Sequence, residues 1–148
     1  MDPTQTLLGV LMRWIHITSV VFVVGGMLYA RLILLPAMAR LSPQDRQSMT
    51  DRLAAYLSPW AWAAMAAIVG SGLYNFFTKA GYPPGYHMWF GIKILLALHV
   101  FAVLMLLTKS GGDERKRARW MTGVIISALI VIAISAWLRW ISVPAVPA

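Results

Sequence analysis

Three ionisable side chains that can bind a metal lie in otherwise apolar stretches of this sequence: His16, Lys93 and His99. Neutral imidazole nitrogen is a standard axial ligand of haem iron, and it also binds copper. An ionisable group inside a membrane-spanning helix is costly to bury and marks a functional site. The sequence therefore predicts that these side chains contribute to a cofactor or metal site.

The depth of these side chains in a membrane follows from a helical rise of about 1.5 Å per residue. His16 then lies about 13 Å below the outer end of its helix, and His99 lies about 20 Å below the outer end of its own. Lys93 is about 120° around the helix from His99, so the two cannot point squarely at one ligand. This favours a haem b between the two helices, ligated by His16 and His99. Lys93 is then the candidate catalytic residue at the haem edge, or an alternative second ligand.

Four further residues fit a haem. Gly25 and Gly26 would let a flat macrocycle lie against the backbone of the first helix, and Arg13 and Arg139 at outer helix ends could pair with propionates. A second interpretation stays open. The histidines would then form hydrogen bonds between helices, and the glycines would only tighten packing.

Copper is the alternative metal. Met12 and His16 are spaced i and i+4 and share one helix face, and His87 and Met88 lie at the outer edge of another helix. Thioether and imidazole ligands together make a soft site that suits copper. Methionine on a helix face also serves simply as packing.

These side chains must be positioned by membrane helices. The chain has 148 residues, of which 59% are hydrophobic, and a mean hydropathy of +0.69. This composition predicts one all-α integral membrane domain over residues 1–148, and excludes a soluble domain. Four spans are expected, at about 7–35, 54–77, 86–107 and 120–141. The motif SPQD before the second span is expected to cap a short helix, with Pro59 in the first turns of the span.

Charge predicts the topology. The basic residues that give the net charge of +8 lie mostly in the first and third loops, whereas the second loop holds Lys79 alone. The positive-inside rule then predicts an antiparallel four-helix bundle with both termini outside, in a bacterial inner membrane, and no nucleic-acid partner. The absence of cysteine excludes disulfides, iron–sulfur clusters and thiolate metal sites. MDPTQT has no basic region, so no signal peptide is expected.

Several motifs resemble known membrane families. H-I-x-x-V-V and G-G-M-L-Y-x-R-L within 16–32, R-L-x-x-x-x-x-P at 52–59 and W-x-x-x-K at 89–93 resemble the HemJ-type haem-containing protoporphyrinogen oxidases. That resemblance implies a haem-ligand role for His16 and a functionally required Lys93. The layout H…GG…PA, then SGLYN at 71–75, then a lysine in the third span also resembles the copper-resistance D membrane domain family.

Three functions follow as expectations. The first is a b-type haem membrane redox protein, whose partners would be the lipid bilayer, a quinone or a small anionic electron donor such as superoxide, and a second copy of the chain. The second, implied by the resemblance, is protoporphyrinogen oxidation. The third is copper transport or copper resistance. If the chain is an enzyme, we expect a membrane haem oxidoreductase.

Overall fold

The structure is a computed structural model that describes residues 3–78, 84–108 and 114–141. Its elements are the helix α1 (Pro3–Tyr29), the π-helical turn η1 (Ala30–Leu34), and the helices α2 (Leu35–Met38), α3 (Pro43–Phe77), α4 (Tyr86–Leu107) and α5 (Glu114–Trp140). These described residues form helices and no strand, as the expected all-α class requires.

Four helical segments are long and apolar enough to cross a membrane: Thr6–Met38, Pro43–Phe77, Tyr86–Leu107 and Arg115–Trp140. The four expected long apolar helices are therefore present, and the third, Tyr86–Leu107, coincides with the predicted range 86–107. Large apolar and aromatic side chains such as Trp14 and Leu95, each 69% exposed, point away from the rest of the protein. Such exposure suits side chains that face lipid rather than water.

The polar start of α3 differs from the expectation of a separate short helix. Ser42 caps the helix, because its hydroxyl oxygen accepts a hydrogen bond from the backbone N–H of Asp45 at 3.2 Å. The helix then continues without a break to Phe77, so Pro59 lies in its interior rather than in its first turns. Proline inside a spanning helix is tolerated where neighbouring groups satisfy the freed carbonyl.

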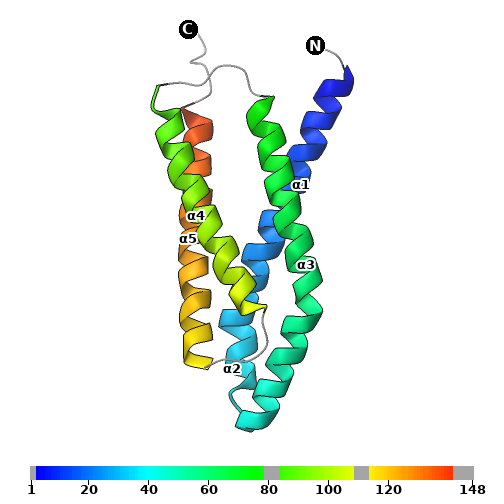
Figure 1. Cartoon of the computed structure of the whole chain (residues 1–148), viewed down its shortest axis with the longest axis vertical. Coiled ribbons are helices and arrows are strands. Elements are labelled where there is room, and N and C mark those ends of the chain that lie inside the picture. Colours follow the sequence, from blue (N-terminus) through cyan, green and yellow to red (C-terminus); the bar gives the residue numbers. More distant parts are fainter. Residues whose placement is uncertain (1–2, 79–83, 109–113, 142–148) are drawn as a thin grey trace.

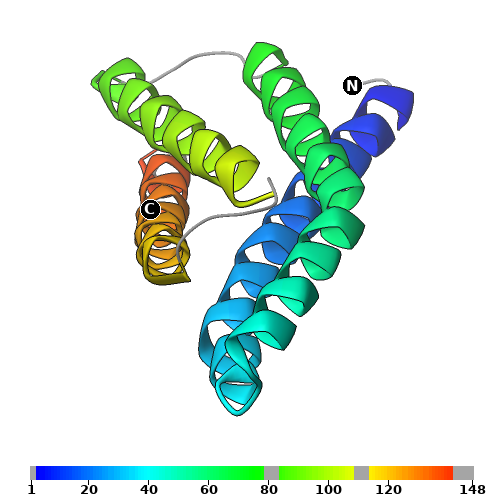
Figure 2. The same ribbon diagram turned by 60° about the horizontal axis from the view of Figure 1, so that its bottom comes forward.

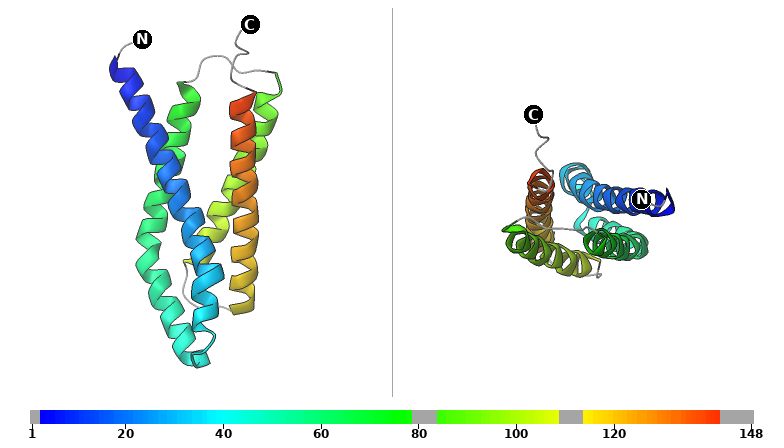
Figure 3. Two further views of the ribbon diagram at one scale, coloured as in Figure 1. Left: turned by 180° about the vertical axis from the view of Figure 1, so that it is seen from behind. Right: turned by 90° about the horizontal axis from the view of Figure 1, so that it is seen from above.

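The four long helices are arranged as two pairs. Helix α1 packs along α3, and α4 packs along α5, whereas the contacts between α1 and α5 and between α3 and α4 are sparser. Seen from above, the two pairs lie side by side (Figure 3), and Figure 2 shows the same separation from a tilted direction. The start of α1 and the end of α5 lie at the upper end of the molecule (Figure 1).

Two apolar clusters join the pairs. The main core draws buried residues from all four long helices: Val23, Met27, Ala61, Ala64, Met65, Val100, Leu104, Leu107, Val124 and Ala128. Nearer the upper end, the Phe76 ring of α3 stacks on the Phe90 ring of α4, with centroids 4.5 Å apart. Phe90 also stacks on Tyr86 at 5.9 Å. The aromatic stack therefore links α3 to α4 at a second point, apart from the main core.

A buried arginine of α5 contacts both α4 and α3 near the lower end of the molecule. Arg117 of α5 is 7% exposed, and its Nη2 donates a hydrogen bond to the carbonyl oxygen of Leu107 at 2.7 Å. Its Nη1 lies 3.6 Å from Oδ1 of Asp51 on α3. One guanidinium thus contacts the last turn of α4 and a carboxylate of the other helix pair.

Candidate metal-binding site

Among the predicted site residues, His16 has side-chain hydrogen bonds to a neighbouring helix. Its ring is half-buried on α1 and lies against α3, where Nδ1 is 3.1 Å from the carbonyl oxygen of Ile68 and 3.0 Å from the Ser71 hydroxyl oxygen. Ser71 itself is 2% exposed. The imidazole is therefore held from one side, by two groups of a neighbouring helix.

These partners define which ring nitrogen carries the proton. A carbonyl oxygen only accepts hydrogen bonds, so the Nδ1 of His16 must donate to Ile68. The Ser71 hydroxyl donates its own hydrogen to the Ala67 carbonyl, which leaves its oxygen free to accept from the same Nδ1–H. The neutral ring then presents the lone pair of Nε2. An imidazole that donates its other N–H to a backbone carbonyl is the usual arrangement of a metal-binding histidine.

A glycine makes room for this ring. A Cβ atom built on Gly72 of α3 would lie 3.4 Å from Cε1 and 3.7 Å from Nδ1 of His16. The imidazole therefore rests against the α3 backbone at this position, where a Cβ would touch the ring and a branched side chain would press on it. The same test on Gly70 meets nothing within 4 Å.

Lys93 and His99 lie on different faces of α4. Lys93 is half-buried, and Val100, two turns further along the same stripe, is buried in the main core. His99 is exposed, as is Leu106 on its own stripe. The face that carries Lys93 therefore continues into the core, whereas His99 itself is exposed. The pairing of His16 with His99 stays a prediction from the sequence.

The expected copper ligands are divided between helices. Met12 is half-buried on α1, one turn before His16. His87 and Met88 are both exposed at the start of α4, and α1 contacts α3 and α5 rather than packing along α4. Among the described residues, no group of three or more His, Asp or Glu side chains is placed to hold a metal. A site at His16 would therefore draw on Met12 and not on the pair at the start of α4.

The four residues expected to support a haem besides its ligands are exposed. Arg13 on α1 and Arg139 on α5 both reach the surface. Gly25 and Gly26 are exposed as well, and a Cβ atom on either would meet nothing within 4 Å. This arrangement shows open space beside the glycines rather than a cradle shaped by other side chains.

Ser71 and Gly72 were not among the predicted site residues. They begin the SGLYN segment, 71–75, which carries the resemblance to the copper-resistance D family. That segment is the signal that could have found them. In the structure Ser71 and Gly72 lie against the His16 ring. Two parts of the layout, far apart in the chain, therefore meet at one imidazole.

Comparison with known proteins gives one informative similarity. The chain is 30% identical over 135 residues to the copper transport protein CutJ of Bacillus subtilis (strain 168), an alignment that covers 80% of this chain. The chain spans 23% of the length of that relative. No family model matches the sequence, and no solved structure matches it.

Proposed function

We propose that this chain is a multi-pass membrane protein that binds copper at His16 and takes part in copper transport or copper resistance. The observation that carries the proposal is the orientation of the His16 ring, whose Nδ1–H is engaged by α3 and whose Nε2 is left to bind a metal. The similarity to CutJ, whose name assigns it to copper transport, supports copper as the metal.

Met12 is the second ligand in this proposal. It lies one helical turn before His16, and the stripe that they share continues to Val23 and Met27, both 7% exposed. The stripe therefore faces the interior of the protein. An imidazole nitrogen and a thioether sulfur together favour copper over harder divalent ions.

The topology is part of the proposal. An antiparallel arrangement with both termini outside a bacterial inner membrane follows from the basic first and third loops. Met12 and His16 then lie in the outer half of the first span, so copper would enter from the outside.

Copper binding by the purified protein tests this function. The protein, reconstituted in lipid nanodiscs, would be titrated with Cu(I) in competition with a chromophoric chelator. We expect His16→Ala to weaken binding at least about tenfold, since the loss of one ligand or its support changes affinity by that order. His16→Ala binding copper as tightly as the wild type would refute the proposal.

Haem b is the second candidate, and the same Nε2 of His16 favours it. His99 is exposed, so haem ligation by both His16 and His99 stays a prediction from the sequence. Protoporphyrinogen oxidation and a quinone or superoxide partner also stay predictions from the sequence. An absorption spectrum of protein purified from haem-replete cells separates the candidates. A Soret band that His99→Ala abolishes supports haem, whereas copper binding that His99→Ala leaves unchanged supports the copper site.

A further inference from the structure

An arginine of the first helix pair contacts α5 in the lower half of the molecule (Figure 1). Arg31 lies in the π-helical turn η1, and its Nε donates a hydrogen bond to Oγ1 of Thr122 at 3.2 Å. The Thr122 hydroxyl in turn donates to the carbonyl oxygen of Ala118 at 3.0 Å. Because the hydroxyl hydrogen is engaged within α5, its oxygen is left to accept from Arg31. The guanidinium is therefore held at one place on the surface, by a turn of a kind that is rare and frequent at functional sites.

The rest of the Arg31 guanidinium is available to a ligand. A guanidinium carries five N–H donors, of which Nε–H is used by Thr122. Among the residues that the structure describes, none accepts a hydrogen bond from Nη1 or Nη2 of Arg31. The four remaining N–H groups keep the planar fork that binds a phosphate through two parallel hydrogen bonds.

A second arginine lies beside the first. Arg119 is exposed one turn below Thr122 on α5, and positions three apart on a helix have Cβ atoms about 5–6 Å apart. Its long side chain can therefore reach an anion that Arg31 binds. Among the side chains that the structure describes, the carboxylates are those of Asp45 and Asp51, and both lie on α3 in other contacts. Two like charges at this spacing repel each other, and a bound anion relieves the repulsion.

The same face of α5 is apolar above the arginines. Ile126 and Leu129, one and two turns above Thr122, are 55% and 51% exposed. On the neighbouring η1, Leu32 is 65% exposed. A phosphate bound by the two arginines could therefore carry acyl chains along exposed apolar side chains. This combination favours a phospholipid over a free phosphate ion, because a free ion would make no use of the apolar surface.

We propose that Arg31 and Arg119 bind the phosphate group of an anionic phospholipid, and that Thr122 positions Arg31 for it. A headgroup with net negative charge complements two guanidinium groups, whereas a zwitterionic headgroup brings its own cation to the site. In the proposed topology both arginines lie toward the cytoplasm, so the lipid belongs to the inner leaflet. The inference goes beyond the proposed copper function and does not depend on His16.

Native mass spectrometry of the full-length protein tests this site. The protein would be released from detergent micelles that contain phosphatidylglycerol, which is anionic, or phosphatidylcholine, which is zwitterionic. We expect the wild type to retain one tightly bound phosphatidylglycerol. Arg31→Gln and Arg119→Gln should each weaken binding of this lipid at least about tenfold, since a hydrogen bond to a charged group contributes that order. The double variant should lose the same single lipid.

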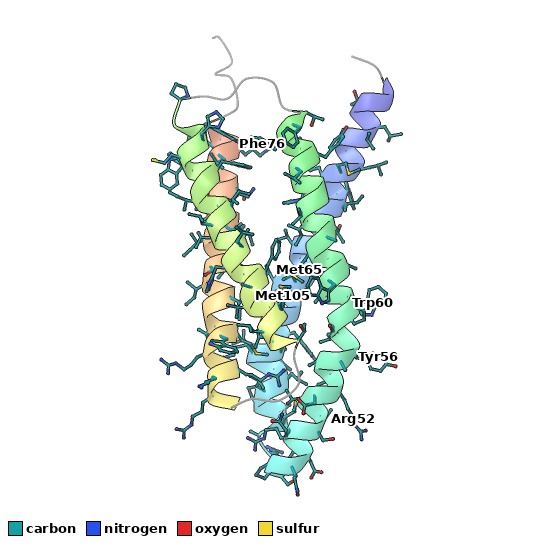
Figure 4. All side chains as sticks on the ribbon, in the orientation of Figure 1. Arg52, Tyr56, Trp60, Met65, Phe76 and Met105 are labelled. Atoms are coloured by element: carbon teal, nitrogen blue, oxygen red, sulfur yellow. The ribbon has the colours of Figure 1, made fainter. Side chains whose placement is uncertain are left out.

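An exposed arginine of α3 provides the matched control. In Figure 4, Arg52 projects with Tyr56 and Trp60 from the side of α3 that lies away from α4 and α5 in this view. Arg52→Gln removes the same charge and should retain the lipid like the wild type. Thr122→Val keeps both arginines but removes the hydroxyl that holds Arg31, so it should weaken lipid binding about fivefold. Thermal unfolding of each variant checks that the fold is kept.

Four outcomes would overturn the proposal. Equal lipid loss in Arg52→Gln and Arg31→Gln would show general attraction to a basic surface. Loss of two lipids in the double variant would show that the arginines bind separate molecules. Equal retention of phosphatidylcholine would remove the preference for an anionic headgroup, and displacement of the lipid by millimolar inorganic phosphate would make the ligand a soluble phosphate.

The copper function is tested separately. Chelator competition should give the same Cu(I) affinity for Arg31→Gln as for the wild type, because the proposed copper ligands Met12 and His16 lie in the upper half of the first span. Lipid retention should likewise be the same in His16→Ala as in the wild type. Failure of the lipid site would thus leave the copper proposal intact, and failure of the copper proposal would leave the lipid site intact.

Discussion

The Nδ1 of His16 on α1 lies 3.0 Å from the hydroxyl oxygen of Ser71 on α3, 55 positions further along the chain. The contact fixes the ring within a helix pair rather than between the two pairs. It also defines the proton-bearing nitrogen, because the neighbouring Ile68 carbonyl can only accept. Whatever His16 binds must approach from the side of the ring that faces away from α3.

Removal of the Ser71 hydroxyl should weaken metal binding without unfolding the protein. We expect Ser71→Ala to lower Cu(I) affinity about tenfold, because the ring keeps the Ile68 carbonyl but loses its second acceptor. Ser135 is a matched control, since its hydroxyl donates to the Val131 carbonyl within α5 at 2.7 Å. Chelator competition compares Ser71→Ala with Ser135→Ala. Rescue by Ser71→Thr, which restores the hydroxyl, identifies hydrogen bonding as the cause.

Gly72, which lies against His16, and Gly70, which does not, allow a steric test on a single helix. Gly72→Val should reduce copper binding by about tenfold or more, because even a Cβ atom at this position would lie 3.4 Å from the ring and a branched side chain would displace it. Gly70→Val adds the same side chain where a Cβ meets nothing within 4 Å. Equal copper affinity in the two variants would show that Gly72 does not support the ring.

Substitution of Lys93 tests whether its amine repels a copper ion at the His16 site or binds that ion. A charged Lys93 ammonium opposes a cation bound at His16, so Lys93→Leu, which adds no copper ligand, should tighten Cu(I) binding about tenfold, the effect of roughly 1.4 kcal/mol. Lys93→Arg keeps the charge and should bind copper like the wild type. Weaker binding in Lys93→Leu would instead make the lysine amine a ligand. Chelator competition at fixed pH measures all three proteins.

Arg117 should be important for stability rather than for copper. Arg117→Ala removes a buried hydrogen bond to the Leu107 carbonyl and the charge that faces Asp51, and should lower the free energy of unfolding by about 2 kcal/mol. Arg119 is exposed on the same helix, and its replacement by alanine should change stability by less than about 0.5 kcal/mol. Reversible unfolding in mixed micelles provides the comparison. Equal losses of unfolding free energy in Arg117→Ala and in the Arg119 variant would mean that the buried contacts of Arg117 contribute little to stability.

The topology predicts opposite labelling of two engineered cysteines. The chain has no native cysteine, so Ser110→Cys and Pro84→Cys each introduce a single thiol. In intact cells an impermeant thiol reagent should label Pro84→Cys and not Ser110→Cys, because the basic loop around position 110 is expected inside. Ser110 lies outside the described residues, so this is a prediction from charge alone. Labelling of Ser110→Cys in intact cells would reverse the proposed orientation.

Hydropathy predicted the positions of the four long apolar helices, because a long apolar run is the sequence signal of a helix able to cross a membrane. The predicted range 86–107 is the range of α4. Helices α3 and α5 begin earlier than expected, at Pro43 and Glu114, because polar residues continue the helix beyond the apolar run. Hydropathy does not detect such extensions.

The neighbours of His16 were harder to predict. Helical periodicity placed His16 on a stripe with Val23 and Met27, and the burial of both confirms that this face points inward. Periodicity does not identify the helix that covers a face. We expected the third span opposite His16, whereas α3, the second span, provides Ser71 and Gly72. Short loops favour packing of consecutive helices, and that rule would have given the correct neighbour.

The division into two helix pairs has a consequence for biosynthesis. His16 on α1 and its partners Ile68 and Ser71 on α3 all belong to the first helix pair, which ends at Phe77. A chain emerging from the ribosome can therefore assemble this imidazole environment as one helical hairpin before α4 has been synthesised. Lys93 and the main-core residues of α4 and α5 arrive with the second hairpin. The order of translation therefore allows the surroundings of the His16 ring to form before the main core packs.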